Sequence, residues 1–181
     1  NDYSILDFET NYLAGNILED GVDEKYDLYL PSEVKGSIYE HCIKAIEKSL
    51  NFGEHGLPKI GSGDWNDGFS TVGNKGKGES VWLAFFLGVV LNKFVKICEY
   101  MENRNGNVSG SIDEKNKLSI KYKKIVEQLK KSINTNAWDG RWFKRAFMDD
   151  GKELGSLQND ECKIDSIAQS WSVISNLGDN D

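Results

Sequence analysis

Apolar residues recur at intervals of three and four in four stretches of the chain, a spacing typical of helices with one buried face. The pattern predicts helices over about residues 33–51, 78–102, 113–136 and 165–176. In the second stretch the polar residues form only a narrow stripe, so this helix is expected to be buried on two sides. In the first, Ser37 and Glu40 have the spacing of a capping box, in which the two residues satisfy each other's backbone N–H groups.

A long glycine-rich loop, residues 52–76, separates the first two predicted helices. It contains seven glycines between Gly53 and Gly76, which disfavour regular structure. Loops of this length inside a compact domain are usually either functional or disordered. Trp65 and Phe69 argue against disorder, so the loop is expected to be functional.

Two further segments lack the helical pattern. Residues 1–32 show no sustained period and are expected to form an extended, loop-rich lead-in. Residues 141–148 precede the turn sequence Asp149-Asp150-Gly151 and predict one arm of a short β-hairpin. The chain is therefore expected to be all-α, with helical hairpins and long loops, as in part of an α/α toroid.

Length and charge narrow the class of protein. The 181 residues suffice for one domain with a substantial core. A formal net charge of −7 and a pI of 5.0 disfavour nucleic acid and anionic membranes as main partners, because both require a basic face. The longest apolar run, Val81–Leu91, is too short to span a bilayer, so we expect no membrane-spanning segment.

The cysteines and histidines do not form a metal-binding or disulfide pattern. Cys42, Cys98 and Cys162 are odd in number and far apart, which favours reduced thiols in a cytoplasmic protein. His41 and His55 lack the spacing of metal ligands, so no metal site is expected. The oligomeric state does not follow from the sequence.

The chemistry of the chain is concentrated in Gly61–Gly68, within the long loop. Asp64, Trp65, Asn66 and Asp67 place two carboxylates, an amide and an indole in four consecutive positions. A sugar site needs this mixture: an aromatic face for the pyranose, polar groups for its hydroxyls and a carboxyl that can transfer a proton. From these residues alone, an ordinary surface turn and a carbohydrate site both remain open.

Four segments in register cover nearly the whole chain and carry a family resemblance. They are SIYEHCIKAIEKSL at 37–50, HGLPKIGSGDWNDGFSTVGNKGKGESVWLAFFL at 55–87, WDGRWFKRAFMDDGKELGS at 138–156 and NDECKIDSIAQSW at 159–171. They resemble the glycoside phosphorylases of the cellobiose phosphorylase type, glycoside hydrolase family 94. The likeness is greatest to the phosphorylase-like C-terminal region of cyclic β-1,2-glucan synthases and to 1,2-β-oligoglucan phosphorylases.

The resemblance implies a fold and a reaction. The family's catalytic domain is an (α/α)6 barrel whose active site lies among inter-helix loops at one mouth, and residues 1–181 are expected to be a single fragment of it. The chain opens at Asn1 without an initiator Met, and we expect it to be a piece of a longer protein. The family cleaves a β-glucosidic bond of an oligosaccharide with inorganic phosphate as co-substrate, inverts the anomeric carbon and needs no further cofactor. A cyclic glucan synthase parent would allow attachment to a membrane.

The second aspartate of the family's Asp-Trp-Asn-Asp motif is the general acid, and it corresponds to Asp67. Because phosphate is itself a good nucleophile, a single carboxylic acid suffices. To act at neutral pH Asp67 has to retain its proton. The negative charge of Asp64 and desolvation by Trp65 and bound sugar are the expected causes.

Five other residues are candidates for contact with the sugar. Trp65 is expected to stack on or wall the glucosyl unit, with a structural plug as the alternative. Asp64 and Asn66 are expected to bind hydroxyls or to hold the turn through backbone hydrogen bonds. Glu161 and Gln169, in the fourth segment, either line the sugar sites or form structural hydrogen bonds.

Two positions qualify the resemblance. Glu79 is expected to cap the second predicted helix, with ligand contact as the alternative. Ile167 stands where cellobiose-type members carry a glutamate, which disfavours cellobiose and fits the β-1,2-glucan relatives. The family's upstream arginine and aspartate and its downstream histidine have no counterpart here, so the isolated chain is expected to be inactive. The rival interpretations are a non-catalytic carbohydrate-binding remnant and an inverting hydrolase of a related (α/α)6 family.

Overall fold

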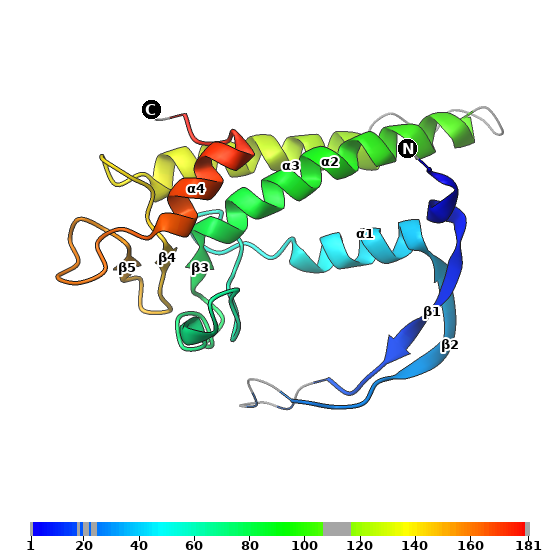
Figure 1. Cartoon of the computed structure of the whole chain (residues 1–181), viewed down its shortest axis with the longest axis horizontal. Helices are drawn as coiled ribbons and strands as arrows, with labels where there is room; N and C mark the ends of the chain where they lie inside the picture. The colour runs from blue at the N-terminus through cyan, green and yellow to red at the C-terminus, as the bar shows by residue number, and fades with distance from the viewer. Residues whose placement is uncertain (1, 18, 20–21, 23–24, 107–116, 180–181) are drawn as a thin grey trace. The chain divides into compact units, whose positions relative to one another are not determined.

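The computed structural model describes residues 2–17, 19, 22, 25–106 and 117–179, and it is rich in helix (Figure 1). The chain divides into two compact units, Asn1–Asn51 and Phe52–Asp181. The assignment of all 181 residues to one (α/α)6-barrel domain stays a prediction.

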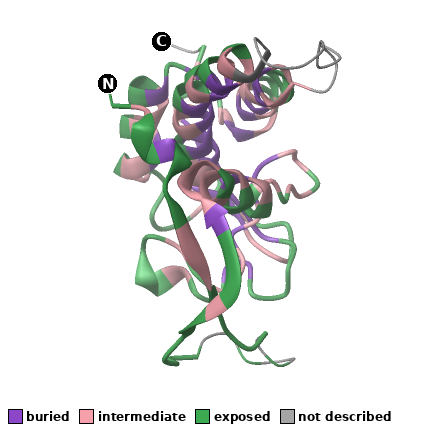
Figure 2. Cartoon of the chain, turned by 90° about the vertical axis from the view of Figure 1, so that its right-hand side faces the viewer, coloured by how far each residue is buried: buried purple, intermediate pink, exposed green. Residues whose placement is uncertain are grey.

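The first unit contains a two-stranded antiparallel sheet. Strand β1 (Glu9–Ala14) follows a 3-10 turn, η1 (Ser4–Asp7), and pairs with β2 (Leu30–Ser37). The predicted loop-rich lead-in over residues 1–32 is therefore wrong where it supplies β1. The two strands are largely exposed or half-buried (Figure 2), and Gly36 is their single buried residue. No two-residue period therefore marked them in the sequence.

Helix α1 (Ile38–Ser49) completes this unit and confirms the predicted capping box. The Ser37 hydroxyl accepts a hydrogen bond from the Glu40 N–H at 3.2 Å, and the Glu40 carboxylate accepts one from the Ser37 N–H at 2.8 Å. The helix begins at Ile38 and not near residue 33, because the residues before it pair in β2.

The second unit is built on the long helix α2 (Val81–Gly106), which packs against both α3 (Leu118–Ser132) and α4 (Ser166–Ser175). Its side chains Phe85, Leu91 and Cys98 are fully buried. This packing confirms the expected burial on two sides. The predicted start of the third helix at residue 113 lies outside the described residues.

The end of α3 is a π-helical turn, η4 (Ile133–Ala137), which connects three distant segments. The side-chain amide of Asn136 donates to the carbonyl of His55 at 2.8 Å, and that of Asn134 donates to the carbonyl of Leu177 at 2.7 Å. The turn thus ties the start of the glycine-rich loop and the end of α4 to α3.

A three-stranded antiparallel sheet lies at the start of α2. Its order is β3 (Glu79–Ser80), β4 (Ala146–Phe147) and β5 (Glu153–Leu154). Strands β4 and β5 form the predicted hairpin. Gly151 adopts a positive φ of 85° in its turn, a conformation that favours glycine. The all-α prediction is thus corrected to a helix-rich fold with two small sheets. The strands of the second sheet have two residues each, too few for an alternating pattern.

The glycine-rich loop is irregular, as predicted, apart from one 3-10 turn, η2 (Asp67–Phe69). Ile60, within the loop, is held next to the residues that follow the loop because its N–H donates to the Gly78 carbonyl at 2.9 Å. Beneath it lies a small apolar cluster formed by buried Ile60, Val72 and Ala146, with Phe69, Met148 and Leu154 packed against them. The loop is therefore attached to the sheet by a core of its own.

By length and composition, the segment Val81–Arg104 of α2 is apolar enough to cross a membrane. Half of its most apolar window is buried inside the protein, against α3 and α4. This burial is the packing of a core helix. The expectation that the chain does not span a membrane stays a prediction.

Candidate active site

The residues from Asp64 to Asp67 form a tight turn in which one side chain is buried and others are exposed. The Asp64 carboxylate accepts a hydrogen bond from the Asn66 N–H at 2.9 Å, and the Asn66 side chain accepts one from the Gly68 N–H at 3.4 Å. These bonds are typical of aspartate and asparagine turns. As a result the Asp64 side chain is 1% exposed, whereas Trp65 is 77% exposed and Asp67 is also exposed.

A cavity of about 520 Å³ lies between this turn and the N-terminus of α4. Its described lining consists of Trp65, Asn66, Asp67, Arg145, Asp165, Ser166 and Ile167. The structure therefore brings three of the predicted site residues together. It also places Ile167, the position that departs from the cellobiose-type pattern, in the same cavity.

Asp64 is not among the described residues that line the cavity, but it forms an ion pair with Arg145, which is. Both side chains are 1% exposed, so this is a buried pair of opposite charges. Because the guanidinium lies against it, Asp64 does not act on Asp67 as an isolated negative charge. The structure thus favours the second of its two predicted roles, that of holding the turn.

Arg145, Asp165 and Ser166 line the cavity but were not predicted as site residues from the sequence. Besides Asp64, the Arg145 guanidinium contacts the Ser80 hydroxyl at 3.2 Å and lies 4.6 Å from the centre of the Phe69 ring. Its Nε is 3.6 Å from Asp165 Oδ2, an ion-pair distance too long for a hydrogen bond. The arm 141–148 also contains Arg141 and Lys144, so no signal in the sequence distinguished Arg145 from the other two cations.

Asp165 is the N-cap of α4. Its Oδ1 accepts a hydrogen bond from the Ile167 N–H at 2.9 Å, which satisfies one of the free amides at the helix start. The cap fixes the first turn of the helix and with it the place of Ile167 on the cavity wall.

The two other predicted contacts of the sugar lie elsewhere. The Gln169 amide makes three bonds to backbone: it accepts from the Phe143 N–H at 2.9 Å and donates to the carbonyls of Phe143 at 2.7 Å and Asp165 at 3.1 Å. Glu161 is exposed in the loop before α4. Neither side chain is among the described residues that line the cavity, and their roles in substrate binding stay predictions.

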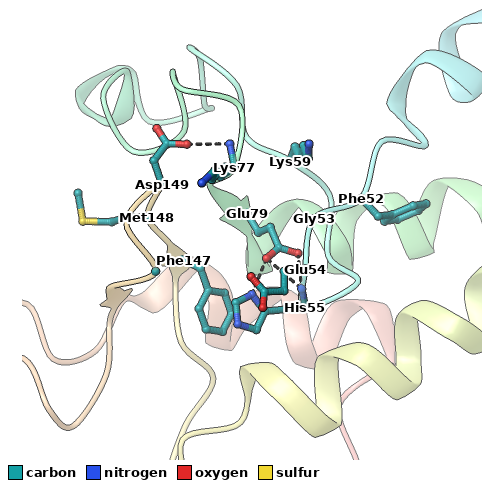
Figure 3. Close-up of a pocket in the computed structure, with 11 residues that line it drawn as sticks. Phe52, Gly53, Glu54, His55, Lys59, Lys77, Glu79, Phe147, Met148 and Asp149 are labelled. Carbon is teal, nitrogen blue, oxygen red and sulfur yellow. Dashed lines mark hydrogen bonds and ion pairs between the residues drawn. The ribbon is translucent and has the colours of Figure 1, made fainter.

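Glu79 holds the start of the glycine-rich loop (Figure 3). Its carboxylate, 1% exposed, accepts hydrogen bonds from the backbone N–H groups of His55 and Leu57 at 3.1 Å and 3.0 Å, and contacts His55 Nδ1 at 2.5 Å. The expected capping role is wrong, because Glu79 lies in β3 and the Ser80 hydroxyl accepts the Leu83 N–H at 3.2 Å instead.

Asp149 holds the other end of the loop. Its carboxylate accepts hydrogen bonds from the backbone N–H groups of Lys75, Lys77 and Gly78, at 2.8, 2.8 and 2.9 Å. Burial acts to raise the pKa of Asp149, but the three amide donors and the Lys75 charge outweigh it and lower the pKa below its ordinary value. Three carboxylates thus anchor the loop: Glu79 at its start, Asp64 in its middle and Asp149 at its end.

Among the residues that the structure describes, no group of three or more histidine, cysteine, aspartate or glutamate side chains is placed to hold a metal ion. The expectation that inorganic phosphate is needed as co-substrate, with no other cofactor, stays a prediction. The cavity itself offers a carboxyl, an amide and an indole, groups suited to a polyhydroxylated ligand.

Several known proteins are similar in sequence to most of this chain. The chain is 37% identical over 180 residues to cyclic beta-(1,2)-glucan synthase NdvB of Rhizobium meliloti (strain 1021), which covers 98% of the chain and 6% of that protein. It is 31% identical over 150 residues to solabiose phosphorylase of Paenibacillus borealis, covering 82% of the chain and 18% of the relative. It is 32% identical over 142 residues to cellobionic acid phosphorylase of Neurospora crassa, covering 78% and 16%.

The chain thus spans only a small part of each of these relatives. A family model of the glycosyl hydrolase 94 superfamily, catalytic domain, matches residues 5–181. The match includes the turn with Asp67, the arm with Arg145 and the start of α4. The chain therefore belongs to the glycosyl hydrolase 94 superfamily and represents part of its catalytic domain.

Proposed function

We propose that the complete enzyme containing this chain cleaves a β-glucosidic bond with inorganic phosphate and inverts the anomeric carbon. A phosphate oxygen forms the new bond to C1 as the bond from C1 to the glycosidic oxygen breaks. Asp67 gives its proton to that departing oxygen, which becomes a hydroxyl of the released sugar. The other product is α-glucose 1-phosphate.

The observation that carries this proposal is the contrast between the two aspartates of the turn. Asp64 is buried against Arg145, whereas Asp67 is exposed on the wall of the cavity. No described residue forms a hydrogen bond or ion pair with the Asp67 side chain. A general acid has to reach the leaving group without competition from protein partners, and Asp67 meets this condition.

Trp65 supports a sugar as the ligand. Its indole is 77% exposed beside Asp67 on the cavity wall, where its flat apolar face is available to a ligand. The apolar face of a glucosyl unit would bury it. We assign Trp65 to the wall of the sugar site and Asn66, which also lines the cavity, to a hydroxyl contact.

Phosphorolysis requires no catalytic base among the residues that line the cavity, whereas hydrolysis requires one. An inverting hydrolase needs a second carboxylate as general base. Asp165 is the other carboxylate among the described lining residues, and both of its oxygens are engaged, one with the Ile167 N–H and one with Arg145. Phosphate as nucleophile makes such a base unnecessary. A non-catalytic carbohydrate-binding remnant would not need an acid at Asp67.

We further propose a β-1,2-glucan as substrate. In the cellobiose-type members that the chain resembles, a glutamate stands at the position of Ile167, which here presents an apolar side chain to the cavity. A relative with 37% identity carries the name cyclic beta-(1,2)-glucan synthase. Both observations favour a β-1,2 over a β-1,4 linkage.

The test is release of sugar 1-phosphate by the complete enzyme from β-1,2-, β-1,3- and β-1,4-linked glucose disaccharides, with and without phosphate. We expect phosphate-dependent release that is fastest for the β-1,2 disaccharide. Asp67→Asn should lower turnover by about 10²- to 10⁴-fold, the usual contribution of a general acid.

Asp150→Asn is the matched control, because Asp150 is exposed in the β4–β5 turn, and it should retain wild-type turnover. Retention of more than about a tenth of turnover by Asp67→Asn would rule out its assignment as the acid. Equal sugar release without phosphate would favour the hydrolase. The isolated 181-residue chain is expected to be inactive in the same assay.

A further inference from the structure

We infer that Arg145 is a positioning residue, which fixes the direction of the Asp67 carboxyl by holding the chain on both sides of it. The inference rests on the proposed function, since it assumes that Asp67 is the acid. It assigns to a buried arginine of the hairpin arm a role in the proton transfer.

The contacts of Arg145 bracket Asp67. On one side its guanidinium pairs with Asp64, whose carboxylate also accepts the Asn66 N–H. On the other side the guanidinium lies 4.6 Å from the centre of the Phe69 ring, in the same 3-10 turn as Asp67. A single side chain therefore restrains the residues before and after the acid.

Arg145 is itself held by the sheet. Its N–H donates to the Leu154 carbonyl at 2.7 Å, and its carbonyl accepts from the Val81 N–H at 3.1 Å. The Ser80 hydroxyl accepts a hydrogen bond from Nη1 at 3.2 Å. These hydrogen bonds fix Arg145 to β3, β5 and the start of α2.

The same guanidinium also connects the turn to the start of α4, which lines the same cavity. Its Nε is 3.6 Å from Asp165, the N-cap of α4. Nε is fully buried and has no hydrogen-bond partner among the described residues, so its attraction to Asp165 is purely Coulombic. Arg145 thereby contacts both the turn that contains Asp67 and the helix cap that holds Ile167.

Burial decides between positioning and direct contact with substrate. The Arg145 side chain is 1% exposed, and Nη1 and Nη2 already bond to Ser80 and Asp64. It has little surface to offer a sugar. Removal of its charge would leave the Asp64 carboxylate buried without a counter-ion, a situation in which the turn is expected to rearrange.

The experiment compares two substrates in the complete enzyme. One is the disaccharide that the wild type cleaves fastest, whose leaving oxygen needs a proton. The other is β-glucosyl fluoride: phosphate oxygen bonds to C1, the C–F bond breaks, and fluoride leaves as an anion without protonation. A displaced acid slows the first reaction far more than the second.

The variants are Arg145→Gln, Arg145→Lys, Asp64→Asn and the double variant Arg145→Gln/Asp64→Asn. For Arg145→Gln we expect kcat on the disaccharide to fall by about 10²-fold, within the range of general-acid effects, and kcat on the fluoride by less than about tenfold. KM should change little. Arg145→Lys retains a cation for Asp64 and should recover part of the loss, and the double variant should be no slower than Arg145→Gln.

Lys144→Gln is the matched control, since it removes an adjacent, largely buried cation that pairs with Glu153 at 2.7 Å outside the cavity. It should lower kcat on the two substrates equally or not at all. If Arg145→Gln does not fold, Arg145→Lys and Asp64→Asn take its place, and the loss of kcat on the disaccharide is compared with the loss of kcat on the fluoride in each.

Equal losses on the two substrates would show that Arg145 only maintains the fold, and a raised KM with unchanged kcat would show contact with the substrate. Either result overturns the inference. Asp67→Asn separates it from the proposed function. If Asp67→Asn retains activity on the disaccharide, the proposed acid fails. If Asp67→Asn is slow on the disaccharide alone while the Arg145 variants match the wild type, only the positioning role fails.

Discussion

Glu79 offers the sharpest test of how the glycine-rich loop is held. Its buried carboxylate accepts the N–H groups of His55 and Leu57 and contacts the His55 ring nitrogen at 2.5 Å. Leu57 is 0% exposed, so Glu79→Ala leaves its N–H without a partner and without access to water. A stranded buried donor costs about 1–3 kcal/mol.

The bonds from the partly exposed His55 to the charged carboxylate add to this loss, since hydrogen bonds to a charged group contribute about 1.5–3 kcal/mol. We therefore expect Glu79→Ala to lower the free energy of unfolding by about 3–5 kcal/mol. Glu79→Gln keeps the shape and one acceptor oxygen but loses the charge, and it should lower that free energy by about 2 kcal/mol.

Urea unfolding followed by tryptophan fluorescence measures this effect in the right place, because all five tryptophans lie within Phe52–Asp181. Glu99→Gln is the control. Glu99 pairs with Lys123 at 2.6 Å, but their side chains are 42% and 56% exposed, so the loss should stay below about 1 kcal/mol. If Glu79→Ala and Glu99→Gln unfold at the same urea concentration, the inferred anchoring by Glu79 is wrong.

Three further predictions concern the same loop. Trp65→Ala should change the free energy of unfolding by less than about 0.5 kcal/mol, because the indole is exposed, while kcat/KM of the complete enzyme falls; a large loss of stability would instead indicate the structural plug. The pKa of Asp149 is lowered from 3.8 in the folded protein, so its contribution to stability is present above pH 3.8 and lost as the pH falls through the lower folded value. Acid titration of the urea midpoint should show this loss in the wild type and not in Asp149→Asn. Gly78→Ala would place a Cβ 2.5 Å from the Val72 carbonyl oxygen and should destabilise by about 1–3 kcal/mol in urea unfolding, whereas Gly63→Ala, with no atom within 4 Å, should not.

Local patterns predicted the helices well because their signals lie within a few residues of each other. The box of Ser37 and Glu40 sets the start of α1, and the apolar spacing of α2 reflects its burial against α3 and α4. The strands β1 and β2 were not predicted from the sequence because both of their faces are largely exposed. A sheet without a buried face has no alternating pattern to detect.

The motif predicted the cavity-facing residues but not the contacts that orient them. Trp65 and Asp67 stand in a recognisable turn, whereas the pair of Asp64 and Arg145 joins residues 81 positions apart. Glu79 was predicted to cap α2 because it precedes the start of that helix in the sequence, but its side chain contacts His55. Distances of this kind follow only from tertiary structure.

The π-helical turn η4 has a consequence for the family's tolerance of insertions and deletions. A π turn contains one residue more than an α-helix would use over the same length. Loss of that residue would close the end of α3 as a regular α-helical turn and rotate the side chains that follow it within the turn by about 100° around the helix axis. Asn136 would then face away from His55, whose carbonyl it now binds at 2.8 Å. Length variation between homologues should therefore spare Ile133–Ala137, although these residues are not among the described residues that line the cavity.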